Sequence, residues 1–169
     1  MARPQQNEHP AYFSKYIGLV KGNNIEEAIS NHSQDIANFY LTLPNEKADF
    51  AYADGKWTLQ QVLQHVLDTE RVFMYRALIV ARKSDVVLSS FDENEFAKQA
   101  INSTNSFDTL KEEFTHHRLA SDLFVKSLSQ DMLHTFGAVN GNPITTNAIA
   151  FMNLGHFLHH KNIIEERYL

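Results

Sequence analysis

Four long segments of the chain carry apolar residues at helical spacing, and this pattern constrains the fold more than any other feature. Residues three and four apart lie on the same face of a helix, so each segment would present one apolar face that has to be buried. The segments run from about residue 24 to 43, from 58 to about 79, from about 106 to 128, and from 145 or 146 almost to the end. In a chain of 169 residues they predict one all-α domain, residues 1–169, built as a four-helix bundle.

Local signals indicate where these helices begin and end. Asn24 is the expected N-cap of the first helix, and Pro44 is expected to end it. Thr58 and Gln61 have the spacing of a capping box at the start of the second helix. The Asn-Gly-Asn-Pro sequence at 140–143 indicates a turn before the last helix, with a small hairpin as one option.

Two further segments precede or connect the helices. Residues 1–23 are interrupted by prolines and a glycine, and we expect them to form a lead-in that packs on the bundle. Residues 82–105 are too many for a tight connection between two helices. We expect this segment to cross the length of the bundle, with a short helix near Glu93–Ala100 and with Phe91 and Phe96 as its apolar anchors.

Composition excludes several kinds of function. The chain has no cysteine, which excludes disulfides, zinc–thiolate sites and a thiol nucleophile supplied by the chain itself. Its net charge of −5 gives no general reason to bind nucleic acid or an anionic membrane. The first residues contain no apolar signal-peptide core, and no apolar run is long enough to span a bilayer, so the cytoplasm is the expected location.

Three histidines indicate a metal site. His156 and His160 are four residues apart, so they lie one above the other on a helix and can direct two imidazoles at one point. His65, on the second helix, would supply a third imidazole and leave open positions for water or substrate. Phe157 stands where the HExxH motif of metalloproteases has its glutamate, which excludes that signature. The alternative is that His65 is a satisfied core residue and that the pair lies on the surface.

Other side chains near these histidines each have two interpretations. Asp68 and Glu70 are candidates for a general base or for a hydrogen-bond partner of a ligand histidine, and otherwise they are solvated helix charges. Arg76 would pair with a carboxylate or bind an anionic group of a substrate. Trp57 is interpreted as a core anchor. His159 is rotated away from the face of its neighbours, and we interpret it as a surface residue or as a partner of a ligand.

The run from Trp57 to Glu70 resembles the Trp-Thr/Ser…Val-x-x-His-x-x-Asp-x-Glu signature of the DinB-like superfamily of bacterial four-helix proteins. The pair His156-x-x-x-His160 resembles the second motif of that family, and the likeness extends over about residues 24–169. The resemblance implies an up-down-down-up bundle with a long crossover between the second and third helices.

The same resemblance implies a cofactor and an assembly. The cofactor is a divalent metal ion, nickel or zinc, held by His65, His156 and His160. The assembly is a homodimer. Many members follow the last histidine with a glutamine where this chain has Ile163, a difference that leaves the three ligand positions unchanged.

These observations lead to two main hypotheses for the function. The first is a metal-dependent enzyme that acts on a small molecule, either as a hydrolase or as a transferase that uses a low-molecular-weight thiol, as some relatives do. The second is a non-catalytic metal-binding module associated with stress. Direct binding of nucleic acid is disfavoured by the acidic balance and by the lack of a Lys/Arg cluster. In either enzyme, residues 82–105 would border the mouth of the metal site and set the choice of substrate.

Overall fold

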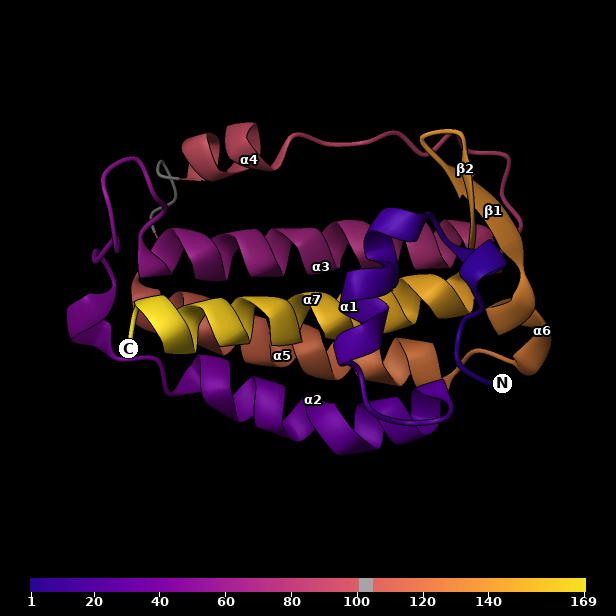
Figure 1. Cartoon of the computed structure of the whole chain (residues 1–169), viewed down its shortest axis with the longest axis horizontal. Coiled ribbons are helices and arrows are strands. Elements are labelled where there is room, and N and C mark those ends of the chain that lie inside the picture. Colours follow the sequence, from indigo (N-terminus) through magenta and orange to yellow (C-terminus); the bar gives the residue numbers. More distant parts are fainter. Residues whose placement is uncertain (101–104) are drawn as a thin grey trace.

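The computed structural model describes residues 1–100 and 105–169. Its body is formed by four long helices, which lie side by side (Figure 1). They are α2 (Ile25–Leu41), α3 (Leu59–Ala81), α5 (Phe107–Lys126) and α7 (Thr146–Arg167). The predicted all-α four-helix bundle is therefore confirmed. Within the described residues, no helix has both the length and the apolar character that a membrane span requires.

Side-chain caps place the starts of the long helices close to where the sequence predicts them. The Asn24 side chain accepts a hydrogen bond from the backbone N–H of Glu27. Thr58 and Gln61 form the reciprocal pair of a capping box, because each side chain accepts from the backbone N–H of the other. Ser106 caps α5 in the same manner as Asn24 caps α2. Each cap satisfies N–H groups that the first turn of a helix leaves unpaired.

Contacts between the helices show their relative directions. Near the start of both α3 and α5, the Gln60 side chain donates to the carbonyl of Asn105 at 3.5 Å. At the far ends, Arg82 after α3 contacts Met132 in α6 (Gln130–His134), which follows α5. The helices α3 and α5 therefore run parallel, whereas α2 and α7 run in the opposite direction (Figure 1). The order along the chain is up-down-down-up.

The segment that connects the two parallel helices returns along α3 and carries α4 (Glu93–Ala100) (Figure 1). Its buried residues are Leu88 and Ala97, which are 5% and 4% exposed. Phe91 is half-buried, but Phe96 is 44% exposed, so the prediction that Phe96 anchors the segment is wrong. Neighbouring positions on a helix differ by about 100° around its axis, so Ala97 faces the bundle and Phe96 does not. Residues 101–104 of the predicted crossover lie outside the described part of the chain.

The N-terminal segment packs on the bundle through α1 (Ser14–Leu19), which lies across α7 (Figure 1). Two short 3₁₀ helices precede it, Gln6–Glu8 and Ala11–Phe13. The Arg3 guanidinium donates to the carbonyls of Ile17 and Val20 at 2.8 and 2.6 Å, which ties the start of the chain to the end of α1. This arrangement holds Tyr16 against the bundle with 8% of its surface exposed.

A hairpin closes one end of the bundle before the last helix begins. Strands β1 (Phe136–Val139) and β2 (Asn142–Thr145) pair antiparallel, with Phe136 opposite Thr145. Asn140 and Gly141 connect them with φ angles of 50° and 74°, the left-handed pair that a two-residue type I′ turn requires. The N–H of Asn140 donates to the carbonyl of Leu88 at 2.7 Å, so the hairpin is also tied to the segment after α3.

Two glycines, Gly155 at the contact of α7 with α1 and Gly18 on the exposed side of α1, provide a matched test of this packing. A Cβ atom at Gly155 would overlap the backbone carbonyl of Tyr16, whereas a Cβ at Gly18 meets nothing within 4 Å. We expect Gly155→Ala to lower the free energy of unfolding by about 1–3 kcal/mol, the usual effect of overpacking. Gly18→Ala should raise it by up to about 1 kcal/mol, because alanine is the better helix former. Denaturant unfolding measures both, and a Gly155→Ala protein as stable as the wild type would contradict this seating of α1.

Candidate metal centre

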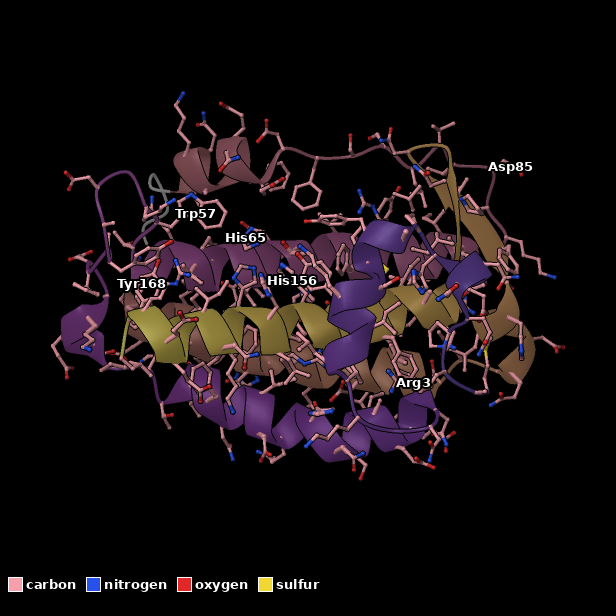
Figure 2. The ribbon with its side chains drawn as sticks, in the orientation of Figure 1. Arg3, Trp57, His65, Asp85, His156 and Tyr168 are labelled. Atoms are coloured by element: carbon pink, nitrogen blue, oxygen red, sulfur yellow. The ribbon has the colours of Figure 1, made fainter. Side chains whose placement is uncertain are left out.

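The helices α3 and α7 bring the three predicted histidines together. Figure 2 shows His65 and His156 at the contact between these two helices. The Nε2 atom of His156 lies 3.2 Å from Nε2 of His65 and 3.1 Å from Nε2 of His160. The i,i+4 spacing on α7 aligns two of the rings, and the antiparallel packing of α3 against α7 supplies the third. Among the described residues this is the one group of three or more potential metal-binding side chains that converge.

Hydrogen bonding explains why these are not ordinary core histidines. His156 is 5% exposed, and its Nδ1 atom has no hydrogen-bond partner among the described residues. Its Nε2 atom faces only the Nε2 atoms of the other two imidazoles. Neutral imidazoles that turn their Nε2 atoms toward one another leave buried lone pairs without enough donors, and a cation between the three Nε2 atoms would give each of them a partner. Nitrogen separations of 3.1 and 3.2 Å are also close to the ~3.0–3.4 Å expected for imidazoles bound to one metal ion at about 2.1 Å.

The three imidazoles are uncharged near neutral pH. Burial lowers the pKa of His65 to about 4, although the negative charge of Asp68 partly opposes the effect. Burial, followed by repulsion from His160 and His65, lowers the pKa of His156 well below its usual value. The pKa of His160 is likewise lowered well below its usual value, first by burial and then by His65. Neutral imidazoles keep the lone pairs that a metal ion needs, so the electrostatics fit a metal site.

The histidine cluster faces a cavity of about 520 Å³. Its walls come from the N-terminal segment, α3, the segment before α4, the hairpin and α7. Residues that line it include Lys15, Tyr16, Thr69, Phe73, Arg76, Phe91, Glu93, Asn142, Ile149, Met152 and His159. A metal site with three protein ligands that opens into such a cavity resembles a catalytic site more than a closed structural one.

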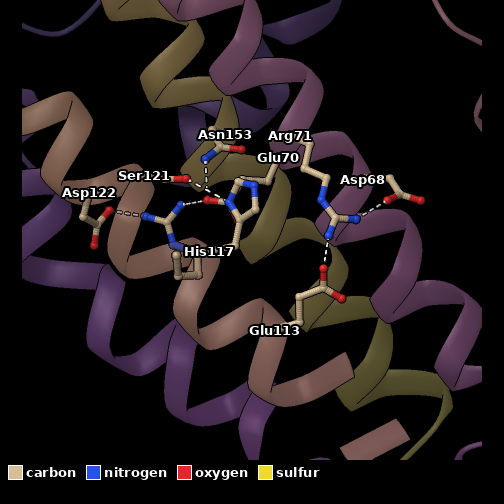
Figure 3. Close-up of polar contacts among 9 residues, drawn as sticks. Asp68, Glu70, Arg71, Glu113, His117, Ser121, Asp122 and Asn153 are labelled. Atoms are coloured by element: carbon tan, nitrogen blue, oxygen red, sulfur yellow. Dashed lines mark hydrogen bonds and ion pairs between the residues drawn. The ribbon is translucent and has the colours of Figure 1, made fainter. Parts of the chain in front are cut away.

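Asp68 and Glu70, the predicted candidates for a base, do not line this cavity. Five residues along a helix amount to a rotation of about 140°, so Glu70 lies on nearly the opposite side of α3 from His65. There Glu70 is fully buried and pairs with Arg118, which also pairs with Asp122 (Figure 3).

Asp68 is rotated less, but it too has partners away from the cavity. Its carboxylate accepts a hydrogen bond from Arg71 at 2.8 Å (Figure 3) and another from Gln64 at 3.0 Å. The Arg71 guanidinium also pairs with Glu113 of α5. Asp68 therefore acts on the histidine cluster through its charge, and the geometry does not bring it into contact with a molecule in the cavity.

The structure places three further residues, Tyr16, His159 and Trp57, in the walls of the site. The ring of Tyr16 lies 5.7 Å from the ring of His156 and 5.2 Å from that of His159, measured between centroids. Burial, together with a hydrogen bond to Tyr12, raises the pKa of Tyr16, which stays protonated. His159 is half-buried and lines the cavity instead of lying on the outer surface. Trp57, interpreted as a core anchor, is half-buried and lines the cavity beside His65, with 4.8 Å between the ring centroids.

A comparison with protein families finds that the model of the DinB superfamily matches residues 29–164. Among curated proteins, the candidate metal-dependent hydrolase OB0782 of Oceanobacillus iheyensis is 30% identical over 63 residues. That match covers 37% of this chain and 37% of the relative, so the chain spans about a third of the relative that it matches.

Two solved structures from Bacillus subtilis have a similar fold. YfiT, a probable metal-dependent hydrolase with an unusual four-helix bundle topology, has a TM-score of 0.65 at 16% identity, over 97% of this chain and 90% of that one. The DinB-like protein YjoA has a TM-score of 0.57 at 15% identity, over 84% of this chain and 86% of that one. At such low identity, these likenesses support the four-helix fold and not a particular reaction.

Metal titration of single variants would test the histidine cluster. We expect one divalent transition metal per chain in wild-type protein prepared without a histidine tag. His65→Ala and His156→Ala should abolish tight binding, because each removes one of three converging nitrogens. His159→Ala is the matched control, since its ring lies outside the group of three. Circular dichroism would establish that the variants fold. Loss of metal from His159→Ala, together with its retention by His156→Ala, would show that the ligands are assigned to the wrong residues.

Unfolding experiments would test the separate positions of Asp68 and Glu70. We expect Glu70→Ala to lower the free energy of unfolding by about 3–5 kcal/mol, because it leaves Arg118 buried with one of its two partners. Asp68→Ala should cost less than about 1 kcal/mol, because its pair with Arg71 is partly exposed. Both variants should keep their metal affinity within about 10-fold. Equal stability of the two variants would contradict this account of the buried pair.

Proposed function

This chain belongs to the DinB superfamily, and on that premise we propose that it is a metal-dependent hydrolase of a small molecule. The observation that supports the proposal most directly is the convergence of three neutral imidazoles, from His65, His156 and His160, at a cavity of about 520 Å³. A cavity of that volume accommodates a small molecule. The relatives whose names include metal-dependent hydrolase are consistent with this reaction class.

In this proposal the three histidines hold the metal ion and the cavity holds the substrate. A divalent metal bound there would lower the pKa of a coordinated water or thiol and polarise a substrate carbonyl. Phe73, Ile149 and Met152 line the cavity with apolar surface and so limit the access of bulk water to the reacting groups. Imidazole ligands suit both nickel and zinc, and we propose one of these as the ion.

Hydrolysis also requires a group that accepts a proton, and the cavity offers His159. Burial, followed by the positive charge of Lys15, lowers the pKa of His159, so its imidazole is neutral at pH 7 and able to take up a proton. Asp68 and Glu70 have guanidinium partners away from the cavity, so His159 replaces them as the proposed base. The protonated Tyr16 hydroxyl is a potential hydrogen-bond donor beside it.

A second candidate is the transfer of a low-molecular-weight thiol to a small molecule. The chain has no cysteine, so the thiol would have to enter the cavity as a second substrate. This reaction needs no carboxylate base in the cavity, which agrees with the positions of Asp68 and Glu70. A non-catalytic stress-associated module is disfavoured by the open cavity beside the histidines, because structural metal sites are normally closed.

The assembly and the cellular setting stay as the sequence predicts them. We propose a homodimer in the cytoplasm, with a small molecule as the main partner and with no role in binding nucleic acid. The net charge of −5 supports the last point.

Substrate screens with metal-loaded protein would test the proposed reaction. We expect protein reconstituted with zinc or nickel to hydrolyse members of a panel of small esters, amides and lactones, and His160→Ala to show no turnover above background. His159→Gln should bind metal normally but lose about 10²–10⁴-fold in kcat, the usual contribution of a general base. Turnover only after addition of a low-molecular-weight thiol would favour the transferase instead. Stoichiometric metal without either activity across the panel would support the non-catalytic module.

A further inference from the structure

Arg76 is a buried cation in the cavity wall, and no ion pair among the described residues includes it. It is 7% exposed, and its guanidinium donates a hydrogen bond to the carbonyl of Ser89 at 2.6 Å and lies 5.6 Å from the centre of the Phe91 ring. Across residues 1–100 and 105–169, no carboxylate lies within ion-pair distance of it. Arg118 is buried to a similar degree but lies between Glu70 and Asp122. The charge of Arg76 is therefore uncompensated, which is costly for a buried group.

The position of Arg76 relates it to the histidine cluster. His65 and Arg76 are eleven residues apart on α3, which places them within about 20° of each other around the helix and about 16 Å apart along it. Thr69 and Phe73 lie between them and also line the cavity. Phe73, together with Met152 and Ile149 of the antiparallel helix α7, makes this middle section largely apolar, between the imidazoles at one end and the buried guanidinium of Arg76 at the other.

The surroundings of Arg76 hold the guanidinium in place without neutralising it. The carbonyl of Ser89 occupies one of its five N–H donors. Leu88, the preceding residue, accepts a hydrogen bond from the N–H of Asn140 in the hairpin, which fixes this part of the chain. A guanidinium fixed in this way, with free donors in a fork, matches the two oxygens of a carboxylate.

We infer that the cavity binds an elongated molecule with an apolar middle and a terminal carboxylate, and that the carboxylate pairs with Arg76 while the reacting group lies at the histidines. This inference rests on the proposed function and specifies its substrate class. One guanidinium balances one negative charge. Lys15 and Glu93 also line the cavity, and their opposite charges offset each other, so Arg76 leaves the lining with one net positive charge, which fits a carboxylate better than a phosphate dianion.

Matched ligands with and without the charge would test the inference. With zinc-loaded protein, the probes are suberic acid monohydroxamate and its methyl ester, which share a metal-binding head and an apolar chain. We expect wild-type protein to bind the free acid about 10- to 100-fold more tightly than the ester, the contribution expected of charge-assisted hydrogen bonds. Arg76→Gln should reduce this preference to about twofold or less. Arg82→Gln, which removes an exposed cation directly after the same helix, should keep it.

A second pair of probes separates this inference from the proposed function. With metal-free protein, octanoate should bind more tightly than octanol, and Arg76→Gln should abolish that difference. Because this experiment uses no metal, its outcome does not depend on the proposed metal-dependent reaction. If Arg76→Gln does not fold, Arg76→Lys replaces it. Lysine lacks the fork of donors, so a preference reduced several-fold would support the inference and an unchanged one would overturn it. Equal affinity of the wild-type protein for acid and ester, or equal preference in the Arg76 and Arg82 variants, would also overturn it.

Discussion

The structure depends most on the complete burial of the first half of α7. Every residue from Thr146 to Phe157 is buried, because α1, α2, α3, α6 and β2 all pack against this helix. A helix buried on all sides has no face on which to leave a polar group in water, so its polar side chains need partners inside the protein. Asn153 reaches Glu70 at 3.4 Å, and His156 faces two other imidazoles. At the candidate metal centre the Nε2 atom of His156 meets this requirement, whereas its Nδ1 atom has no partner among the described residues.

The helix α3 carries its cavity-facing side chains and its buried carboxylate on opposite sides. His65, Thr69, Phe73 and Arg76 face the cavity, whereas Glu70 points to the opposite side and pairs with Arg118. The carboxylates nearest to the histidines in the sequence are therefore bound to cations elsewhere in the bundle (Figure 3). This separation leaves neutral imidazoles near one end of the cavity and, at the other end, a guanidinium with no ion-pair partner among the described residues, an arrangement suited to a metal ion and an anionic ligand.

The remaining walls of the cavity come from segments that lie outside the four long helices. The N-terminal segment contributes Tyr16, the segment before α4 contributes Phe91, and the hairpin contributes Asn142. Hydrogen bonds connect these segments to one another and to the bundle, such as that between Asn140 and Leu88. The helices thus supply the metal ligands, while the connecting segments determine the shape of the space beside them. In such an arrangement, changes in the connecting segments can alter which small molecule binds without changing the residues that hold the metal.

The sequence by itself determined the features that depend on local geometry. The caps at Asn24 and Thr58 and the shared face of His156 and His160 follow from hydrogen bonds and helical spacing within a few residues. Only the tertiary structure decided which distant groups meet. It turned Glu70 toward Arg118, brought Tyr16 to the histidines and, within residues 1–100 and 105–169, left Arg76 without a carboxylate partner. Helical spacing shows which residues share a face, but the partner of each face depends on how the helices pack, which no local pattern specifies.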